Sequence, residues 1–343
     1  MDLEAGLRVA ARTLVAVAIG LAVIGDGQLT AVLIAQIFGA IAAVIVYWLT
    51  FRYAGMPRPR LSLPATVSIL SGGAPFWLAG IAITAQSSID ALLLSVLAPA
   101  EIIGWHGAAW KLIGMVTFPA NVLAAALYPT LSRLAGSAKY GDLLDEALRA
   151  TVVVGFLGAA GTYLFADTAI AWIYGADVFG PAAGNLRVLA PYVLLVFVDI
   201  VLSTAIMAAT SLTPWILAKL ASVVVATGVS VVLIPLSQSS LGNGGLGCAA
   251  GTVAAELVML VATLLLVPAD RARLAGKLLM NLGRGAAAAL AMGVAAWVLR
   301  DALALATMAM AVTTYFLSVG LLGAIRREDV RFVLEVVRFR LPA

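Results

Sequence analysis

The stretch Gly72–Gly136, GGAPFWLAGIAITAQSSIDALLLSVLAPAEIIGWHGAAWKLIGMVTFPANVLAAALYPTLSRLAG, decides the fold of this chain. It contains two apolar runs of membrane length, roughly residues 73–97 and 105–131, joined by a short turn. Each run carries one ionisable residue, Asp90 in the first and Lys111 in the second. An ionised side chain at the bilayer centre costs at least about 2.5–3.5 kcal/mol. We therefore expect this hairpin to form the wall of a cavity.

The composition of the whole chain agrees with membrane insertion. Hydrophobic residues make up 63% of the sequence and charged residues 11%, whereas soluble domains have about 45–50% and 25%. The mean hydropathy is +1.08. The net charge is +4, but the basic residues lie between apolar runs and form no single patch, so nucleic acid is not predicted as a partner. These observations predict an all-α, polytopic transmembrane helical bundle.

The apolar runs predict ten membrane spans, because a hydrocarbon core about 30 Å thick requires about 20 apolar residues per helix. The predicted spans are residues 8–25, 28–50, 73–97, 105–131, 150–172, 187–210, 212–235, 244–267, 284–299 and 302–325. Spans three to eight would form a six-helix unit.

Three parts follow from this arrangement. Residues 1–64 would hold two helices and a basic, proline-containing linker, residues 65–268 the six-helix lobe, and residues 269–343 an extra helix pair and a basic tail. The segments Ser137–Arg149 and Arg326–Arg340 have apolar residues at helical spacing, which predicts amphipathic helices at the cytoplasmic surface against anionic lipids.

The basic residues predict the orientation. Apart from Lys111 and Lys219, which lie inside spans, every Lys and Arg falls near one side of the predicted membrane, except Arg187 and Arg300. Because cytoplasmic loops carry the excess of Lys and Arg, both termini are predicted to be cytoplasmic, in a multi-pass protein of the cell inner (cytoplasmic) membrane.

Five ionisable residues lie inside the predicted six-helix unit: Asp90, Lys111, Asp199, Lys219 and Glu256. One interpretation is a polar cavity that handles a charged head group or a coupling ion. The alternative is that Asp90–Lys111 and Asp199–Lys219 are ion pairs that hold neighbouring helices together. Glu256 has no obvious partner in the sequence, which favours a functional role with a proton or a sodium ion.

The central hairpin also resembles a known family. Its pattern is a Pro-Phe start at Pro75, Ile-Asp before an aliphatic run, a Gly that opens the second helix, a Lys and a Pro within that helix, and a closing Tyr-Pro-x-Leu-x-Arg from Tyr128 to Arg133. This pattern is similar to the seventh and eighth helices of polysaccharide-biosynthesis or lipid-linked oligosaccharide flippases, in the multidrug/oligosaccharidyl-lipid/polysaccharide exporter superfamily. Members often have Tyr where this chain has His106.

The resemblance implies a flippase that moves polyprenyl-diphosphate-linked oligosaccharide for surface polysaccharide assembly. Members commonly have two six-helix lobes, so about four N-terminal helices would be missing here. The implied partners are the lipid-linked oligosaccharide, a coupling proton or sodium ion, anionic lipids and other polysaccharide-assembly membrane proteins. The diphosphate requires cations and the sugar an aromatic surface, which gives as substrate-binding candidates Lys111, Lys219, Arg187, Trp105 and His106. The ion-coupling candidates are Asp90, Asp199 and Glu256.

Other classes of function remain as alternatives. The same superfamily contains cation-coupled drug antiporters, and a chain without four helices could instead be a non-transporting remnant or scaffold. The sequence has no Gly-Lys-Ser/Thr phosphate loop, HExxH, Gly-x-Ser-x-Gly or Cys-x-x-Cys, so a membrane enzyme ranks last and no cofactor is predicted. With one cysteine, Cys248, and one histidine, His106, we expect no intrachain disulfide, no cysteine-based or histidine metal site, and hence no metal.

Overall fold

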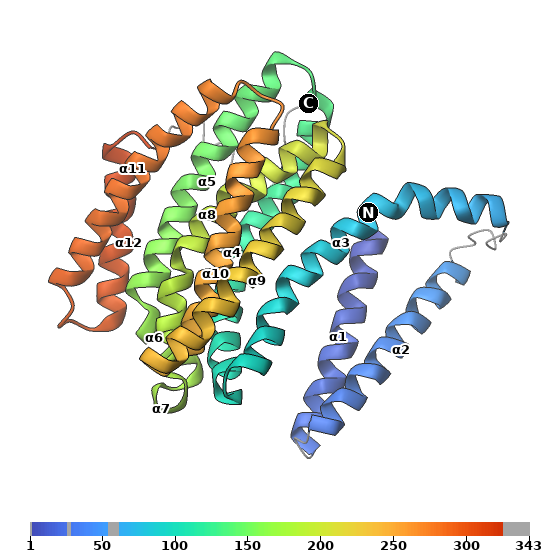
Figure 1. The fold of residues 1–343 in the computed structure, drawn as a ribbon, viewed down its shortest axis with the longest axis horizontal. Helices are drawn as coiled ribbons and strands as arrows, with labels where there is room; N and C mark the ends of the chain where they lie inside the picture. The colour runs from blue at the N-terminus through green and yellow to red at the C-terminus, as the bar shows by residue number, and fades with distance from the viewer. Residues whose placement is uncertain (1, 26–28, 54–61, 325–343) are drawn as a thin grey trace. The chain divides into compact units, whose positions relative to one another are not determined.

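A computed structural model describes residues 2–25, 29–53 and 62–324 (Figure 1). The regular elements of this part of the chain are all α-helices. They are α1 (Asp2–Gly25), α2 (Leu29–Tyr53), α3 (Leu63–Leu97), α4 (Ala100–Leu134), α5 (Ala138–Leu164), α6 (Ala166–Tyr174), α7 (Ala176–Phe179), α8 (Ala182–Ala209), α9 (Leu212–Leu241), α10 (Gly244–Leu266), α11 (Arg271–Val298) and α12 (Ala304–Leu321).

Nine of the described helices are long and apolar enough to cross a membrane. They correspond to the second to tenth predicted spans, which confirms the all-α, multi-pass fold. The apolar part of the first predicted span, Val9–Gly25, is shorter than the other nine.

Some boundaries differ from the prediction. The fifth span runs over Lys139–Leu164 and not over residues 150–172, because the predicted interfacial helix Ser137–Arg149 is the first half of α5. Its residues Leu144 and Leu148 are buried in the bundle, and Asp145 pairs with Lys277 of α11. This segment therefore packs against protein. The linker residues 54–61 and the tail from 325 onward, including Arg326–Arg340, lie outside the described residues.

The chain divides into two compact units, Met1–Ser71 and Gly72–Ala343. In the first unit α1 packs against α2. A Cβ added at Gly39 would lie 2.9 Å from the Cα of Val15, so a glycine is needed where the two helices come closest.

The second unit is built around α8, which packs against α4, α5 and α10. The largest buried side chains on α8 include Leu186, Leu189 and Leu202, and they pack in two apolar clusters that these helices share. The helix pair α11 and α12 joins the bundle through α5 (Figure 1). At that contact the Tyr315 hydroxyl donates a hydrogen bond to the carbonyl oxygen of Val153 at 2.6 Å.

The helices α9 and α10 pack closely against each other over much of their length. A Cβ at Gly247 would lie 2.3 Å from the backbone carbonyl of Leu233, and one at Gly251 would lie 2.1 Å from the Ser230 hydroxyl oxygen. Glycines at these two positions let the backbones approach, as small residues do at helix interfaces in membranes.

Candidate functional site

A cavity of about 160 Å³ lies inside the second unit, where five helices meet. Its walls come from α3, α4, α8, α9 and α10. The residues that line it are Ile83, Gln86, Asp90, Trp110, Tyr192, Lys219, Ala226, Thr252 and Ala255. Two of the five ionisable residues expected to form a polar cavity, Asp90 and Lys219, are therefore in its wall.

Asp90 lies two turns before the end of α3 and is 7% exposed. The Thr252 hydroxyl of α10 donates a hydrogen bond to Asp90 Oδ2 at 3.0 Å, and His106 Nε2 of α4 lies 3.7 Å from the same oxygen. The turn between α3 and α4 is what brings Asp90 and His106 together. A buried carboxylate requires such partners, because an isolated charge in an apolar environment is strongly unfavourable.

Asp199 is buried on α8 outside the lining of the cavity, and its carboxylate is well hydrogen-bonded. Thr263 Oγ1 lies 3.1 Å from Asp199 Oδ1, and Ser203 Oγ lies 3.2 Å from Oδ2. The Trp215 indole of α9 donates to Ser203 Oγ at 2.8 Å. This chain of contacts joins α8, α9 and α10.

Glu256 follows Thr252 by one turn of α10 and is 1% exposed. Its Oε1 atom has no hydrogen-bond partner among the described residues. Glu256 lies near enough to Asp199 and Lys219 to interact with both electrostatically. Glu256 is thus a buried carboxylate with one oxygen that lacks a hydrogen-bond partner.

Lys219 of α9 is half-buried and is the basic residue of the cavity lining. Its charge acts on both Asp199 and Glu256, although no ion pair within 4.0 Å joins these residues in the described part of the chain. Lys219 therefore interacts with Asp199 electrostatically over more than the 4.0 Å of a direct ion pair.

The predicted Asp90–Lys111 pair does not form. Asp90 contacts His106 and Thr252 instead, and Lys111 is exposed on α4, away from the cavity lining. Successive residues of a helix point in directions about 100° apart, so a shared span does not mean a shared face. The role of Lys111 toward substrate stays a prediction.

The structure places Arg187 and Trp105 away from the cavity. Arg187, near the start of α8, forms an ion pair with Asp167 of α6. The indole of Trp105 donates a hydrogen bond to the carbonyl oxygen of Val178 in α7 at 2.8 Å. Both side chains therefore hold the short helices α6 and α7 against the bundle.

The sequence did not indicate four polar or aromatic residues of the lining: Gln86, Trp110, Tyr192 and Thr252. Thr252 could have been found, because it lies four residues before Glu256 and hence on the same face of α10. Trp110 and Tyr192 are aromatic partners with ring centroids 5.3 Å apart. Their pairing joins α4 to α8, which only the fold reveals.

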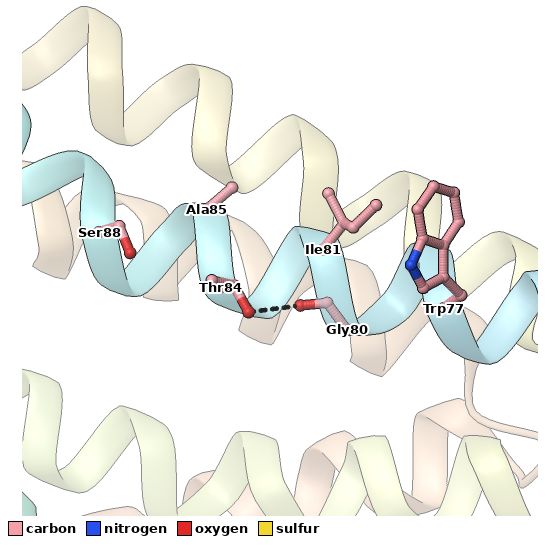
Figure 2. Close-up of a pocket in the computed structure, with 6 residues that line it drawn as sticks. All are labelled: Trp77, Gly80, Ile81, Thr84, Ala85 and Ser88. Carbon is pink, nitrogen blue, oxygen red and sulfur yellow. Dashed lines mark hydrogen bonds between the residues drawn. The ribbon is translucent and has the colours of Figure 1, made fainter. Parts of the chain in front are cut away.

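A second hollow follows one face of α3 and is lined by Trp77, Gly80, Ile81, Thr84, Ala85 and Ser88 (Figure 2). The Thr84 hydroxyl in it donates a hydrogen bond to the Gly80 carbonyl oxygen at 2.8 Å. All six residues come from one helix and none is ionisable. This hollow brings no chemically reactive groups together, so the five-helix cavity is the stronger candidate.

The fold and the cavity define a class of protein: a multi-pass membrane protein with charged and polar groups gathered inside a helical lobe. Such groups mark substrate or ion pathways in membrane proteins. The chain belongs to the family described as polysaccharide biosynthesis protein, whose model matches residues 7–178, about half of the sequence. The family resemblance carried by Gly72–Gly136 is confirmed.

Among solved structures, the chain is similar to the lipid II flippase MurJ in an inward closed conformation. The TM-score is 0.68 with 12% sequence identity, over 91% of this chain and 65% of that chain. The chain thus spans slightly less than two thirds of the MurJ chain. At this identity the likeness shows a shared fold. No curated protein matches the sequence.

Proposed function

We propose that this protein is a flippase-like transporter, and not an enzyme, that moves polyprenyl-diphosphate-linked oligosaccharide across the cytoplasmic membrane. Membership in the polysaccharide biosynthesis family and the fold shared with a lipid II flippase support this proposal. The absence of a phosphate-binding loop from the sequence favours transport driven by an ion gradient or by the membrane potential.

The observation that carries the proposal is the Glu256 carboxylate, one oxygen of which has no partner among the described residues, beside Lys219 and Asp199. A buried carboxyl with an unpartnered oxygen is costly when ionised, and ionisable residues inside membrane spans commonly relay or bind ions. Glu256 would take up a proton or a sodium ion in one state of the transporter and release it in another. Asp90 and Asp199 would set the negative field around it.

The substrate requires positive charge along its path, because a diphosphate is anionic. Lys219 supplies one charge in the cavity wall, where it would exchange between Glu256 and the diphosphate. Lys111 and Arg187 would act outside the cavity. Trp105 remains the candidate for contact with sugar, whereas His106, the other candidate, is buried beside Asp90 and is enclosed by protein.

Transport of the lipid-linked sugar tests the proposal directly. The purified full chain is reconstituted in proteoliposomes that contain a fluorescent polyprenyl-diphosphate oligosaccharide, and its transfer between leaflets is followed by an impermeant quencher. We expect transfer above that of empty vesicles, and loss of it in Glu256→Gln but not in Glu101→Gln, which changes an exposed carboxylate at the start of α4. Well-folded protein that transfers no lipid would refute the proposal and favour a scaffold role.

The orientation is a separate proposal, with both termini in the cytoplasm. Cysteines introduced singly at Ser237–Asn243 should react with an impermeant thiol reagent outside intact cells, whereas cysteines at Ala269–Asn281 should be protected. The natural Cys248 is fully buried, so it should contribute little background labelling by the impermeant reagent. The opposite labelling would reverse the orientation and the side from which substrate enters.

A second candidate is a cation-coupled drug antiporter. The observation that favours it is the charge of the site, since three carboxylates, Asp90, Asp199 and Glu256, lie near Tyr192 of the cavity wall, whereas the cavity lining holds one lysine, Lys219. An excess of carboxylates suits a cationic substrate. Cation-stimulated efflux of a positively charged dye, lost in Asp199→Asn or Glu256→Gln, together with no transfer of the lipid-linked sugar, would select this function.

A further inference from the structure

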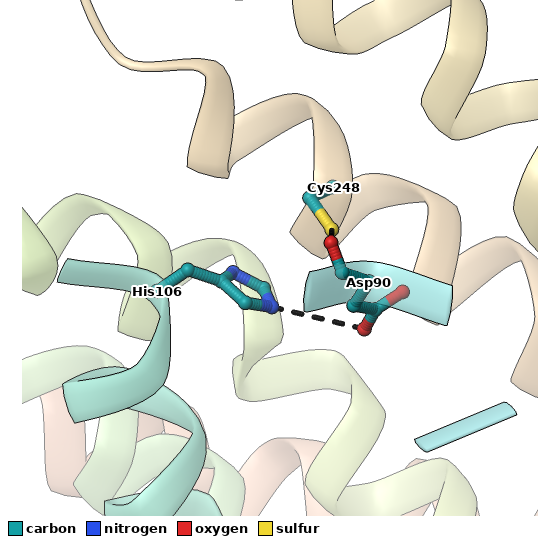
Figure 3. Close-up of side chains that lie close together, drawn as sticks. All are labelled: Asp90, His106 and Cys248. Carbon is teal, nitrogen blue, oxygen red and sulfur yellow. Dashed lines mark hydrogen bonds and ion pairs between the residues drawn. The ribbon is translucent and has the colours of Figure 1, made fainter. Parts of the chain in front are cut away.

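Three potential metal ligands from three different helices come together (Figure 3), and one of them, Asp90, also lines the cavity. They are Asp90 of α3, His106 of α4 and Cys248 of α10, and their ligand atoms all lie within 4.8 Å of one another. The residues are 7%, 5% and 0% exposed. From these residues we propose that the protein binds a soft divalent cation of the zinc class, with Asp90, His106 and Cys248 as its ligands.

The state of His106 is the observation that points to a ligand. Neither ring nitrogen of this buried imidazole has a hydrogen-bond partner among the described residues, and the 3.7 Å from Nε2 to Asp90 Oδ2 is too long for a hydrogen bond. A buried polar group without a partner costs about 1–3 kcal/mol. A cation between His106 and Asp90 would satisfy a nitrogen and a carboxylate oxygen together.

The donor set selects the class of cation. Nitrogen, sulfur and carboxylate oxygen suit zinc, whereas calcium and magnesium require a shell of oxygen atoms. Bonds of about 2.0–2.3 Å around tetrahedral zinc place neighbouring ligand atoms about 3.4–3.8 Å apart. The two ligand atoms that lie farthest apart therefore need to come about 1 Å closer to each other. Rotation about the side-chain bonds allows this movement.

Charge balance also favours a divalent ion. The Cys248 thiol loses its proton to solvent on binding, as metal-bound cysteines do, and His106 binds as the neutral imidazole. A thiolate, a carboxylate and a dication together have no net charge. This matters in a membrane span, where an uncompensated charge is costly.

The surroundings would orient the ligands. The Thr252 hydroxyl holds the Asp90 carboxylate at 3.0 Å, and Trp110 lies parallel to the His106 ring with an angle of 12° between the planes and 6.3 Å between centroids. The five-helix cavity, lined by Asp90 and Thr252, provides the way in for the ion. Three protein ligands leave the fourth position for water.

Cobalt titration tests the site without reference to transport. Purified full chain in detergent, stripped of metal with a chelator, is titrated with Co²⁺ and followed by absorbance. We expect one equivalent to bind, with visible bands of a tetrahedral site and a thiolate-to-cobalt charge-transfer band that Zn²⁺ removes. Cys248→Ser should lose the charge-transfer band and His106→Gln should lose stoichiometric binding. Asp142→Asn, an exposed carboxylate on α5, is the control and should bind like the natural protein.

Two further measurements keep the proposal falsifiable if a ligand variant folds poorly. Thr252→Val should weaken binding by about tenfold to a hundredfold, as loss of an outer-shell partner does. In the natural protein and in Asp142→Asn, Zn²⁺ should raise the melting temperature in detergent, because a ligand that binds the folded state stabilises it. Folded protein that gives no cobalt charge-transfer band, or whose melting temperature Zn²⁺ does not change, would overturn the proposal.

Discussion

Asp199 and Glu256 are both buried carboxylates inside membrane-spanning helices, but their surroundings differ. Asp199 has hydroxyl groups near both of its oxygens, and the chain of contacts continues to Trp215. Glu256 has one oxygen without any partner among the described residues. A satisfied carboxylate fixes neighbouring helices, whereas an unsatisfied one has room for a ligand. We therefore propose that Asp199 mainly holds the helices together and that Glu256 is the ion-coupling residue.

The helix contact behind both carboxylates gives the largest expected effect. Gly247→Ala would place a Cβ 2.3 Å from the backbone of Leu233, and a backbone atom cannot move aside as a side chain does. The variant should lose about 3 kcal/mol of stability and should disturb Asp199 and Glu256 alike, since α10 carries Glu256 and Thr263. Thermal unfolding in detergent measures the loss.

Gly228→Ala on α9 is the matched control. A Cβ there meets no atom within 4 Å, so this variant should keep or slightly raise the melting temperature because alanine favours helix. Equal melting temperatures for Gly247→Ala and Gly228→Ala would show that the close contact of α9 and α10 does not hold the site.

Substitutions at Asp199 and at Glu256 test whether the two carboxylates differ in their contribution to stability. Asp199→Ala removes the acceptor of Thr263 and Ser203 and should lower the free energy of unfolding by about 2–3 kcal/mol, the size expected for hydrogen bonds to a charged group. Glu256→Gln should change stability by less than about 1 kcal/mol, because it removes a buried charge and keeps the shape. If both variants lose the same stability, the distinction between the carboxylates fails.

The smallest effect on stability is expected at Lys111. Its side chain is exposed and no ion pair joins it in the described part of the chain, so Lys111→Ala should lie within about 0.5 kcal/mol of the natural protein. A large loss of stability would mean that Lys111 has a structural partner. Lipid transfer by the same variant reports on its proposed contact with the diphosphate.

The sequence predicted the fold well because the signal for a membrane helix is strong. Nine predicted spans overlap helices of sufficient length and apolar character. The residue pattern of the hairpin Gly72–Gly136 indicated the family. The errors arose at Ser137–Arg149, where charged residues looked like a surface helix. Their carboxylates Asp142 and Asp145 contact Arg273 and Lys277 of α11, and such contacts between distant segments leave no trace in a local pattern.

The site was harder to predict than the fold. The positions of Asp90, Asp199 and Glu256 in apolar runs predicted that these residues are buried. The same positions did not predict which side chains they contact. His106 and Thr252 contact Asp90 although 162 residues separate Asp90 from Thr252. No metal site was predicted, because the sequence has one cysteine and one histidine, whereas the fold gathers an aspartate, a histidine and a cysteine. Only the packing of α3, α4 and α10 brings these together.

The most direct test of the account is ion-coupled transport by Glu256→Gln in proteoliposomes. A pH gradient or a sodium gradient is imposed in turn, and transfer of the fluorescent lipid-linked oligosaccharide is compared with that of the natural protein and of Glu101→Gln. We expect one of the two gradients to accelerate transfer by the natural protein and by Glu101→Gln, while Glu256→Gln remains folded and does not respond. A Glu256→Gln variant that responds to the gradient as the natural protein does would contradict the assignment of Glu256 to ion coupling.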